Sequence, residues 1–178
     1  MYNDVLTFWF KEIDPKKWWM ADADFDRQIK NRFGDLHGRT AQCELFSWRQ
    51  EPRGRLAEII VLDQFSRNIY RNTPAAFSQD PMALVLAQEA LGAGVHTLLS
   101  PAERGFLFLP YMHSESKTIH ALAEKLYREH TPPYNYEYEL KHKAIIDRFE
   151  RYPHRNQVLG RVSTAEEIEF LKQPGSSF

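Results

Sequence analysis

Two ionisable side chains, Asp63 and Arg67, lie within an apolar stripe of the predicted helix Arg53–Arg71, where they could bind a ligand. Asp63 and Arg67 are four residues apart, so on a helix they share one face and can pair. Moving an ion out of water costs several kcal/mol, so at core positions the two must be paired, fully hydrogen-bonded or next to a wet cavity. Two interpretations stay open: a structural ion pair, or a pocket that faces a ligand.

A second polar group lies in the connection between two predicted helices. His113, Ser114 and Glu115 directly precede the second of these helices, whose free backbone N–H groups favour an anion. In the alternative interpretation Ser114 is only a helix N-cap, with Glu115 in the first turn and His113 in the linker. His142 lies within the apolar face of a later helix, either as a hydrogen-bonded core residue or as a ligand or base.

The third group is cationic and lies at the carboxyl end of that later helix. Arg148, Arg151, His154 and Arg155 suit the negative end of a helix dipole and can bond the free carbonyls there. Dipole complementarity alone is one explanation of this group. The other is that it belongs to a site.

Sites in helical bundles are assembled from side chains on facing helices, and the three groups come from different helices. We therefore expect Arg67, His113 and Arg155 to converge on one partly enclosed pocket that binds a carboxylate or a phosphate. The candidate ligand-binding residues are Asp63, Arg67, Arg71, His113, Glu115, His142, Arg151, His154 and Arg155.

Several function classes are disfavoured by what the sequence lacks. It has no glycine-rich phosphate loop, paired-glycine dinucleotide fingerprint, His-Glu-x-x-His motif or nucleophile elbow. Asp63, His113, Glu115 and His142 have no diagnostic ligand spacing, so we predict neither a metal site nor a cofactor. A net charge of -1 argues against a nucleic-acid partner.

The chain opens with no signal segment and has no apolar run of the ~20 residues that span a bilayer. We therefore predict no membrane partner and a cytoplasmic location. The single cysteine, Cys43, excludes an internal disulfide and is expected to be a small buried hydrophobe.

The elements that must position these residues are predicted to be helices throughout, because no segment alternates with period two. The first four expected helices are Asn3–Phe10, one from about Asp24 with an uncertain end near Gly34 and Gly38, Arg53–Arg71, and one capped by Asp80. The last four run from Ser100 to near Pro110, around Ile119–Tyr127, from Tyr134 to Pro153, and from Ser163 or Thr164 to about Leu171. Ser100 and Glu103 form a capping box. The length suits a single domain, 1–178, with a frayed tail from about residue 173.

Four strings carry a resemblance to a known family: VLTFWF, LDQFSRNIYRNTPAAFSQDPMAL, ERGFLFLPYMHSES and HKAIIDRFERYPHRNQVLGRVSTAEEIEFL. They resemble the bacterial family known as domain of unknown function 924. The resemblance implies a tetratricopeptide-like array of antiparallel helix pairs, with roughly eight or nine helices, and it supplies no activity. The family pattern contains Asp63, Gln64, Arg67, Asn68, His113, Ser114, Glu115, Arg148, Arg151, Pro153, His154, Arg155 and Asn156.

The same pattern usually has proline at Ser66 and glycine near Glu150. We expect serine at this position to let the central helix run on smoothly.

Two functions follow, and whether the protein is an enzyme stays open. The first is a binding module for a small anionic ligand or a peptide carboxylate, with a buried polar site. The second is a hydrolase or transferase that acts on a small anionic substrate, with arginines holding the anion and a histidine or Glu115 moving protons.

Overall fold

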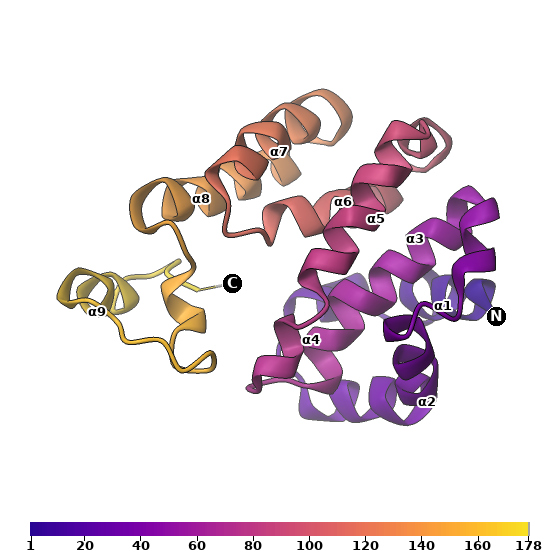
Figure 1. Ribbon diagram of the computed structural model, residues 1–178, viewed down its shortest axis with the longest axis horizontal. Coiled ribbons are helices and arrows are strands. Elements are labelled where there is room, and N and C mark those ends of the chain that lie inside the picture. The colour runs from indigo at the N-terminus through magenta and orange to yellow at the C-terminus, as the bar shows by residue number, and fades with distance from the viewer. Residues whose placement is uncertain (178) are drawn as a thin grey trace.

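A computed structural model describes residues 1–177, and within them the chain is all-α, with no β-strand (Figure 1). The helices are α1 (Tyr2–Thr7), α2 (Ala23–Ala41), α3 (Pro52–Ile60), α4 (Ser66–Ile69), α5 (Asp80–Gly92), α6 (Pro101–Met112), α7 (Lys117–His130), α8 (Pro133–Phe149) and α9 (Ala165–Leu171). The all-α prediction is confirmed. None of these helices combines the length and apolarity needed to cross a membrane.

The central helix is α3 and α4 joined by a wider turn, η4 (Val61–Phe65), in which the hydrogen bonds have π-helical spacing. The expectation that Ser66 lets the helix run on smoothly is therefore wrong. Its hydroxyl donates to the Leu62 carbonyl at 2.6 Å, and an Arg67 guanidinium nitrogen donates to the Asp63 carbonyl at 2.8 Å. The side chains of Ser66 and Arg67 thus bind backbone carbonyls at the point where the helical hydrogen bonds change to the wider spacing.

The helix on the N-terminal side of the second polar group starts as predicted but ends later. Ser100 and Glu103 form the expected capping box. The helix α6 then continues through Pro110 to Met112, because proline removes only its own N–H and His113 still donates to the Leu109 carbonyl at 2.9 Å.

The next helix, α7, begins later than an N-cap at Ser114 would require. Ser116, and not Ser114, caps α7 by accepting a hydrogen bond from the Ile119 backbone N–H at 3.4 Å. The N-cap interpretation of Ser114 is therefore wrong, and residues 113–116 form the connection between α6 and α7.

Three local predictions near the N-terminus also need correction. Asn3 does not cap α1, which starts at Tyr2 and passes into a π-helical turn at Phe8. The helix α2 runs past both glycines to Ala41. Cys43 is exposed, and its sulfur lies 3.7 Å from that of Met82.

Glu150, near which the family pattern has glycine, has a φ of 59° at the end of α8. This left-handed conformation costs a residue with a side chain more than it costs glycine. The glycine of the family pattern therefore matches a backbone requirement at the end of this helix.

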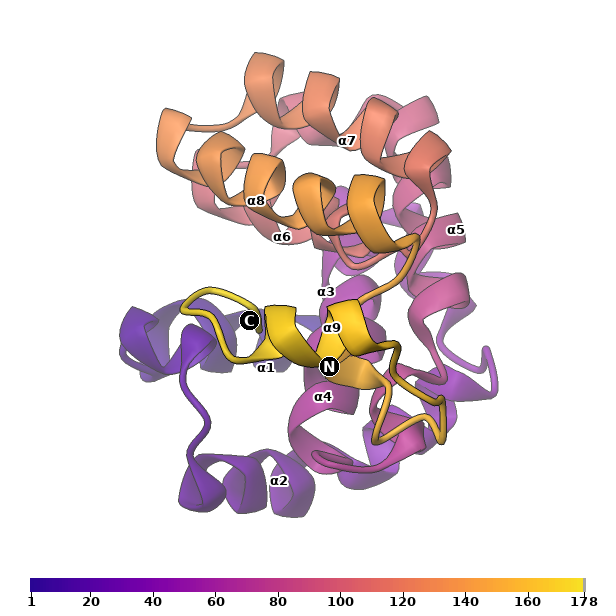
Figure 2. The same cartoon turned by 90° about the vertical axis from the view of Figure 1, so that its left-hand side faces the viewer.

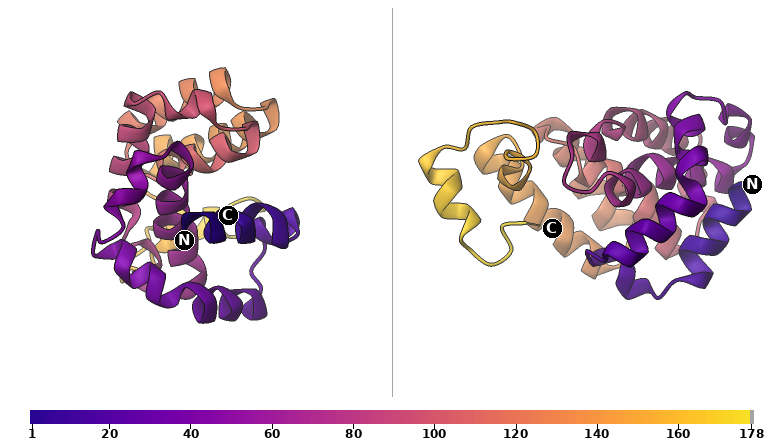
Figure 3. Two further views of the ribbon diagram at one scale, coloured as in Figure 1. Left: turned by 90° about the vertical axis from the view of Figure 1, so that its right-hand side faces the viewer. Right: turned by 90° about the horizontal axis from the view of Figure 1, so that it is seen from below.

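The chain divides into a main body, which contains helices α1 to α8, and a C-terminal segment, residues 150–177, which contains α9. Figure 2 shows α6, α7 and α8 on one side and α2 at the opposite end of the view, and Figures 1 and 3 place α9 at the end of the molecule away from the N-terminus. One apolar cluster extends from α1 to α7, whereas Ile145, Ile146 and Tyr152 form a separate small one. The C-terminal segment therefore needs further contacts, many of them polar, to hold it on the body.

Candidate functional site

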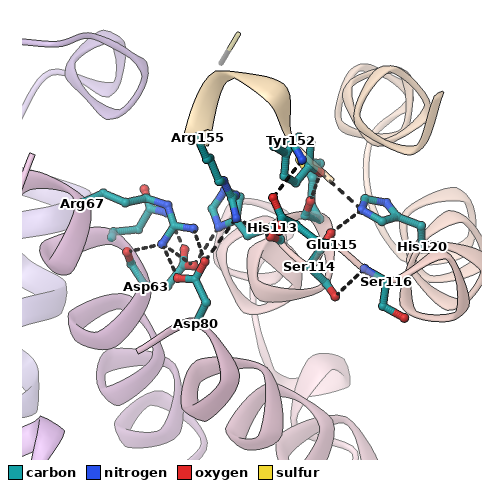
Figure 4. Close-up of polar contacts among 12 residues, drawn as sticks. Asp63, Arg67, Asp80, His113, Ser114, Glu115, Ser116, His120, Tyr152 and Arg155 are labelled. Atoms are coloured by element: carbon teal, nitrogen blue, oxygen red, sulfur yellow. Dashed lines mark hydrogen bonds and ion pairs between the residues drawn. The ribbon is translucent and has the colours of Figure 1, made fainter. Parts of the chain in front are cut away.

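Five ionisable side chains meet where the C-terminal segment joins the body. We call this group the junction cluster; Figure 4 shows its members, which are Asp63 (in η4), Arg67 (α4), Asp80 (the first residue of α5), His113 (directly after α6) and Arg155 (in the short helix η7, Pro153–Arg155).

Arg67 is the most heavily bonded member of the cluster. Its two terminal nitrogens donate to the two carboxylate oxygens of Asp80, each at 2.9 Å. One of these nitrogens also lies 3.0 Å from Oδ1 of Asp63. The Arg67 side chain keeps 19% of its surface exposed, so it is less buried than its core position predicts. Arg67 is therefore a guanidinium whose charge is already compensated.

Asp63 is 1% exposed, as expected, and it orients His113. Its Oδ1 lies 2.7 Å from Nδ1 of His113. Burial alone would raise the pKa of Asp63, but the charge of Arg67 and the contact with His113 lower that pKa below the usual aspartate range. The ionised carboxylate thus accepts the Nδ1 hydrogen, which leaves Nε2 as the basic nitrogen of a neutral imidazole.

His113 is neutral at pH 7, because burial and the charge of Arg67 lower the pKa of its imidazole. Its side chain is 15% exposed. Within residues 1–177, no group is hydrogen-bonded to Nε2. An aspartate-oriented histidine with a free Nε2 can accept or donate a proton to a bound molecule.

Arg155 differs from Arg67 in lacking a close carboxylate. One terminal nitrogen donates to the His113 carbonyl at 3.1 Å, and the nearest carboxylate oxygen, on Asp80, is 3.6 Å away. The side chain is only 7% exposed, and its Nε has no acceptor in the described part of the chain. Burial and the charge of Arg67 lower the pKa of Arg155. Its positive charge is therefore only partly compensated.

Two aromatic rings hold the Arg155 guanidinium in place. Its central carbon lies 4.4 Å from the ring centre of Tyr152 and 4.7 Å from that of Phe77. Arg67 lies over the same Phe77 ring at 5.6 Å. Stacking on aromatic faces suits the flat guanidinium and fixes its plane without using any of its N–H donors.

Glu115 fixes the backbone on the other side of the cluster. It accepts two hydrogen bonds from Arg161, at 2.6 and 2.9 Å, and one from the Tyr152 backbone N–H at 2.8 Å. Its carboxylate thereby holds residues 113–116 against the segment that carries Arg155. Glu115 is a positioning residue here.

A buried histidine–glutamate pair also binds the connection formed by residues 113–116. Nδ1 of His120 lies 2.7 Å from Glu139, and its Nε2 lies 2.8 Å from the Ser114 carbonyl. Both side chains are fully buried, and burial raises the pKa of Glu139. The pair fixes where Ser114 and its neighbour His113 lie.

The structure thus brings together Asp63, Arg67, His113 and Arg155, with Glu115 and His154 beside them, but other candidate residues lie elsewhere. Arg71 pairs with Asp26, and Arg151 pairs with Glu167. His142 is buried, with Nδ1 2.8 Å from the Tyr138 carbonyl, and burial lowers its pKa to about 3.

Asp80, Phe77 and Tyr152 also belong to the site, although no pattern in the sequence points to them as site residues. The sequence predicts that Asp80 caps α5, but its side chain makes no capping bond and instead binds Arg67. A local Asp-Pro pattern favours a cap, and no local signal reports an arginine thirteen residues away.

Two surface hollows have linings that contain no member of the junction cluster. One of about 440 Å³ is lined by residues 148–151, Thr164, Glu166 and Glu167. The other, of about 330 Å³, is lined by Met1, Asp4 and residues 32, 33 and 36. Within residues 1–177, no three His, Cys, Asp or Glu side chains are grouped to hold a metal ion.

His154 gives this region a measurable pH dependence. Burial and the charge of Arg155 lower the pKa of His154 to about 4. Between pH 4 and 6.5 the unfolded chain therefore binds more protons at this histidine than the folded chain does. The contribution of neutral His154 to the free energy of unfolding is full above about pH 6.5 and is lost as the pH falls. From pH 7 to pH 5, the parent should lose about 2 kcal/mol more unfolding free energy than His154→Gln. Urea denaturation at both pH values measures the two losses, and equal losses would contradict the assignment.

Comparisons with known proteins cover nearly the whole chain. Residues 5–175 match the model of a family described as a bacterial protein of unknown function (DUF924). The solved structure of a protein of unknown function, ATU0120 from Agrobacterium tumefaciens, is 35% identical, with a TM-score of 0.91 and 96% of each chain covered. No curated protein matches. The matched part of the chain spans the positions of the junction cluster, and neither match supplies an activity for it.

Proposed function

The chain belongs to the bacterial DUF924 family of unknown function, and from its junction cluster we propose that it binds a small oxyanion, a carboxylate or a phosphate. The observation that carries this proposal is the state of Arg155. This guanidinium is more than nine-tenths buried, and Nε has no acceptor within residues 1–177. A buried donor without an acceptor costs about 1–3 kcal/mol, and more when it is charged. An oxyanion at Arg155 would remove that cost.

Neighbouring groups support the same ligand chemistry. Nε2 of His113 is free among the described residues, and Nδ1 of His154 is buried without a partner there. The two histidines and Arg155 come from the two segments that meet at the junction. Arg155, and His154 in the tautomer that carries its hydrogen on Nδ1, offer nitrogen donors to an anion that lies between these segments, and Nε2 of His113 can accept a hydrogen bond from a hydroxyl group of the same molecule.

The proposal predicts that inorganic phosphate or acetate binds the parent and that Arg155→Gln weakens this binding about ten- to a hundredfold. A hydrogen bond to a charged group contributes about 1.5–3 kcal/mol, and each 1.4 kcal/mol is a factor of ten in affinity. Titration calorimetry at pH 7 and low salt measures the affinity. The matched control is Arg71→Gln, since Arg71 also binds an aspartate but lies outside the junction cluster.

Two results would overturn the proposal. One is that neither anion binds the parent. The other is that Arg155→Gln and Arg71→Gln bind the anion with equal affinity.

A second candidate function is a hydrolase or transferase that acts on a small anionic substrate. The observation that favours it is the 2.7 Å contact between Asp63 and Nδ1 of His113, which leaves Nε2 as a general base on the residue whose backbone carbonyl binds Arg155. Chemical analysis of the bound compound after long incubation separates the two functions. A binding module returns it unchanged, and an enzyme converts it.

We also expect a tetratricopeptide-like array of helix pairs and a cytoplasmic location. Support for the array comes from α6, α7 and α8, which pack in consecutive pairs with short connections. The exposed free thiol of Cys43 suits a reducing compartment.

A further inference from the structure

The junction cluster holds one carboxylate between two guanidinium groups. Asp80 accepts a two-pronged contact from Arg67, both distances being 2.9 Å, and its Oδ2 lies 3.6 Å from Arg155. This fork geometry is the preferred way in which arginine binds a carboxylate. The cluster therefore has the form of a carboxylate-binding site occupied by a side chain of the same protein.

Within the described residues, the two arginines make all of the hydrogen bonds and ion pairs of the Asp80 side chain. It lies at the start of α5, but the helix has no side-chain cap hydrogen bond. Its only side-chain partners in residues 1–177 are Arg67 and Arg155. The side chain is 18% exposed, so it lies next to solvent. Rotation of Asp80 out of the cluster would break no other hydrogen bond or ion pair of its side chain.

The two arginines, in contrast, have anchors that do not involve Asp80. Arg67 keeps its bonds to the carboxylate and the backbone carbonyl of Asp63, at 3.0 and 2.8 Å. Arg155 keeps its bond to the His113 carbonyl and its stacking on Tyr152 and Phe77. The cationic half of the site would therefore stay in place if the Asp80 carboxylate left it.

From this asymmetry we infer that the ligand is a carboxylate that takes the place of the Asp80 side chain on Arg67 and Arg155. The inference rests on the proposed function and names its ligand class. The group that occupies the site is itself a planar carboxylate, so a ligand carboxylate can reproduce its two-pronged contact with Arg67. Asp80 is then a built-in competitor, which closes the site when no ligand is bound.

The test is the affinity for acetate of Asp80→Asn. Loss of a competing negative charge within a few ångströms of the ligand should tighten acetate binding by about tenfold or more relative to the parent, after allowance for solvent screening. The matched control is Asp26→Asn. Asp26 also lies in the first turn of a helix and binds Arg71 with both oxygens, but it is outside the junction cluster. Its replacement should leave acetate affinity unchanged.

A second variant, Asp80→Ala, removes the same charge and should show the same gain, which keeps the test valid if one variant folds poorly. Methanesulfonate carries the same charge and methyl group as acetate but a tetrahedral head, and it should bind Asp80→Asn more weakly than acetate. Tighter binding of methanesulfonate would overturn the carboxylate assignment.

The two proposals fail in different ways. If the parent binds acetate through Arg155 but neither Asp80 variant binds it more tightly than Asp26→Asn, the competitor role of Asp80 is wrong and the binding function stands. If no variant and no parent protein binds any of the anions, both proposals are wrong.

Discussion

Asp63→Asn is expected to lower the free energy of unfolding by about 3–5 kcal/mol, as breaking one partner of a buried ion pair does. Asp63 is 1% exposed, and its Oδ1 contacts both Arg67 and His113. Asparagine keeps an oxygen for these contacts but removes the charge that opposes Arg67. The two arginines of the junction cluster would then share the single remaining carboxylate, that of Asp80.

Chemical denaturation of the variant and the parent measures this loss. Asp147→Asn is the matched control, because Asp147 pairs with Lys143 at the same four-residue spacing but is 47% exposed. That change should cost under about 0.5 kcal/mol. Arg67→Met should resemble Asp63→Asn. Losses below about 1 kcal/mol in both cluster variants would show that the pair does not stabilise the fold.

Gly54→Ala is expected to destabilise the protein by about 3 kcal/mol or more. Gly54 lies in α3 where this helix packs on the short helix η3 (Phe46–Gln50). A β-carbon there would overlap the carbonyl oxygen of Trp48 and stand 2.9 Å from its carbonyl carbon. Both are backbone atoms, so neither can rotate away, and the two helices would have to separate.

The control variant for Gly54→Ala is expected to change stability in the opposite direction. Gly34 lies inside α2, and no atom lies within 4 Å of the place where its β-carbon would be. Gly34→Ala should therefore stabilise the protein by about 0.5–1 kcal/mol, which is the difference in helix propensity. Thermal or urea denaturation of the two variants compares them directly. A stabilising Gly54→Ala would show that α3 and η3 are not in close contact.

The features that could be predicted from the sequence are those set by neighbours in the chain. The capping box at Ser100 was predictable because both of its hydrogen bonds join residues three apart. The burial of Asp63 was predictable because the residues around it are apolar on every side. Local patterns of this kind fix where helices start and which side chains are buried.

The partners of the buried charges were not predictable in the same way. His113 meets Asp63 from fifty residues away, and no spacing in the sequence encodes that contact. Asp80 carries a local signal for a helix cap, and the stronger attraction of two arginines overrides it. The wide turn in the central helix could not be predicted from the sequence. An extra residue in a helix shifts the stripe of apolar residues around the helix axis, but a helix that is apolar on all sides has no such stripe to compare.

That wide turn makes chain length, as well as residue identity, a determinant of the site. Each residue of an α-helix turns the chain by about 100°, and the π-helical spacing of Val61–Phe65 takes up about one extra residue without adding that rotation between α3 and α4. If the segment closed into an even α-helix at the same chain length, Arg67 would swing by about 100° away from Asp80. Substitutions of Val61 or Leu62 would change only packing. Relatives that keep the junction cluster should therefore either keep both the length of this segment and its wide turn, or lack one residue and have an even α-helix here.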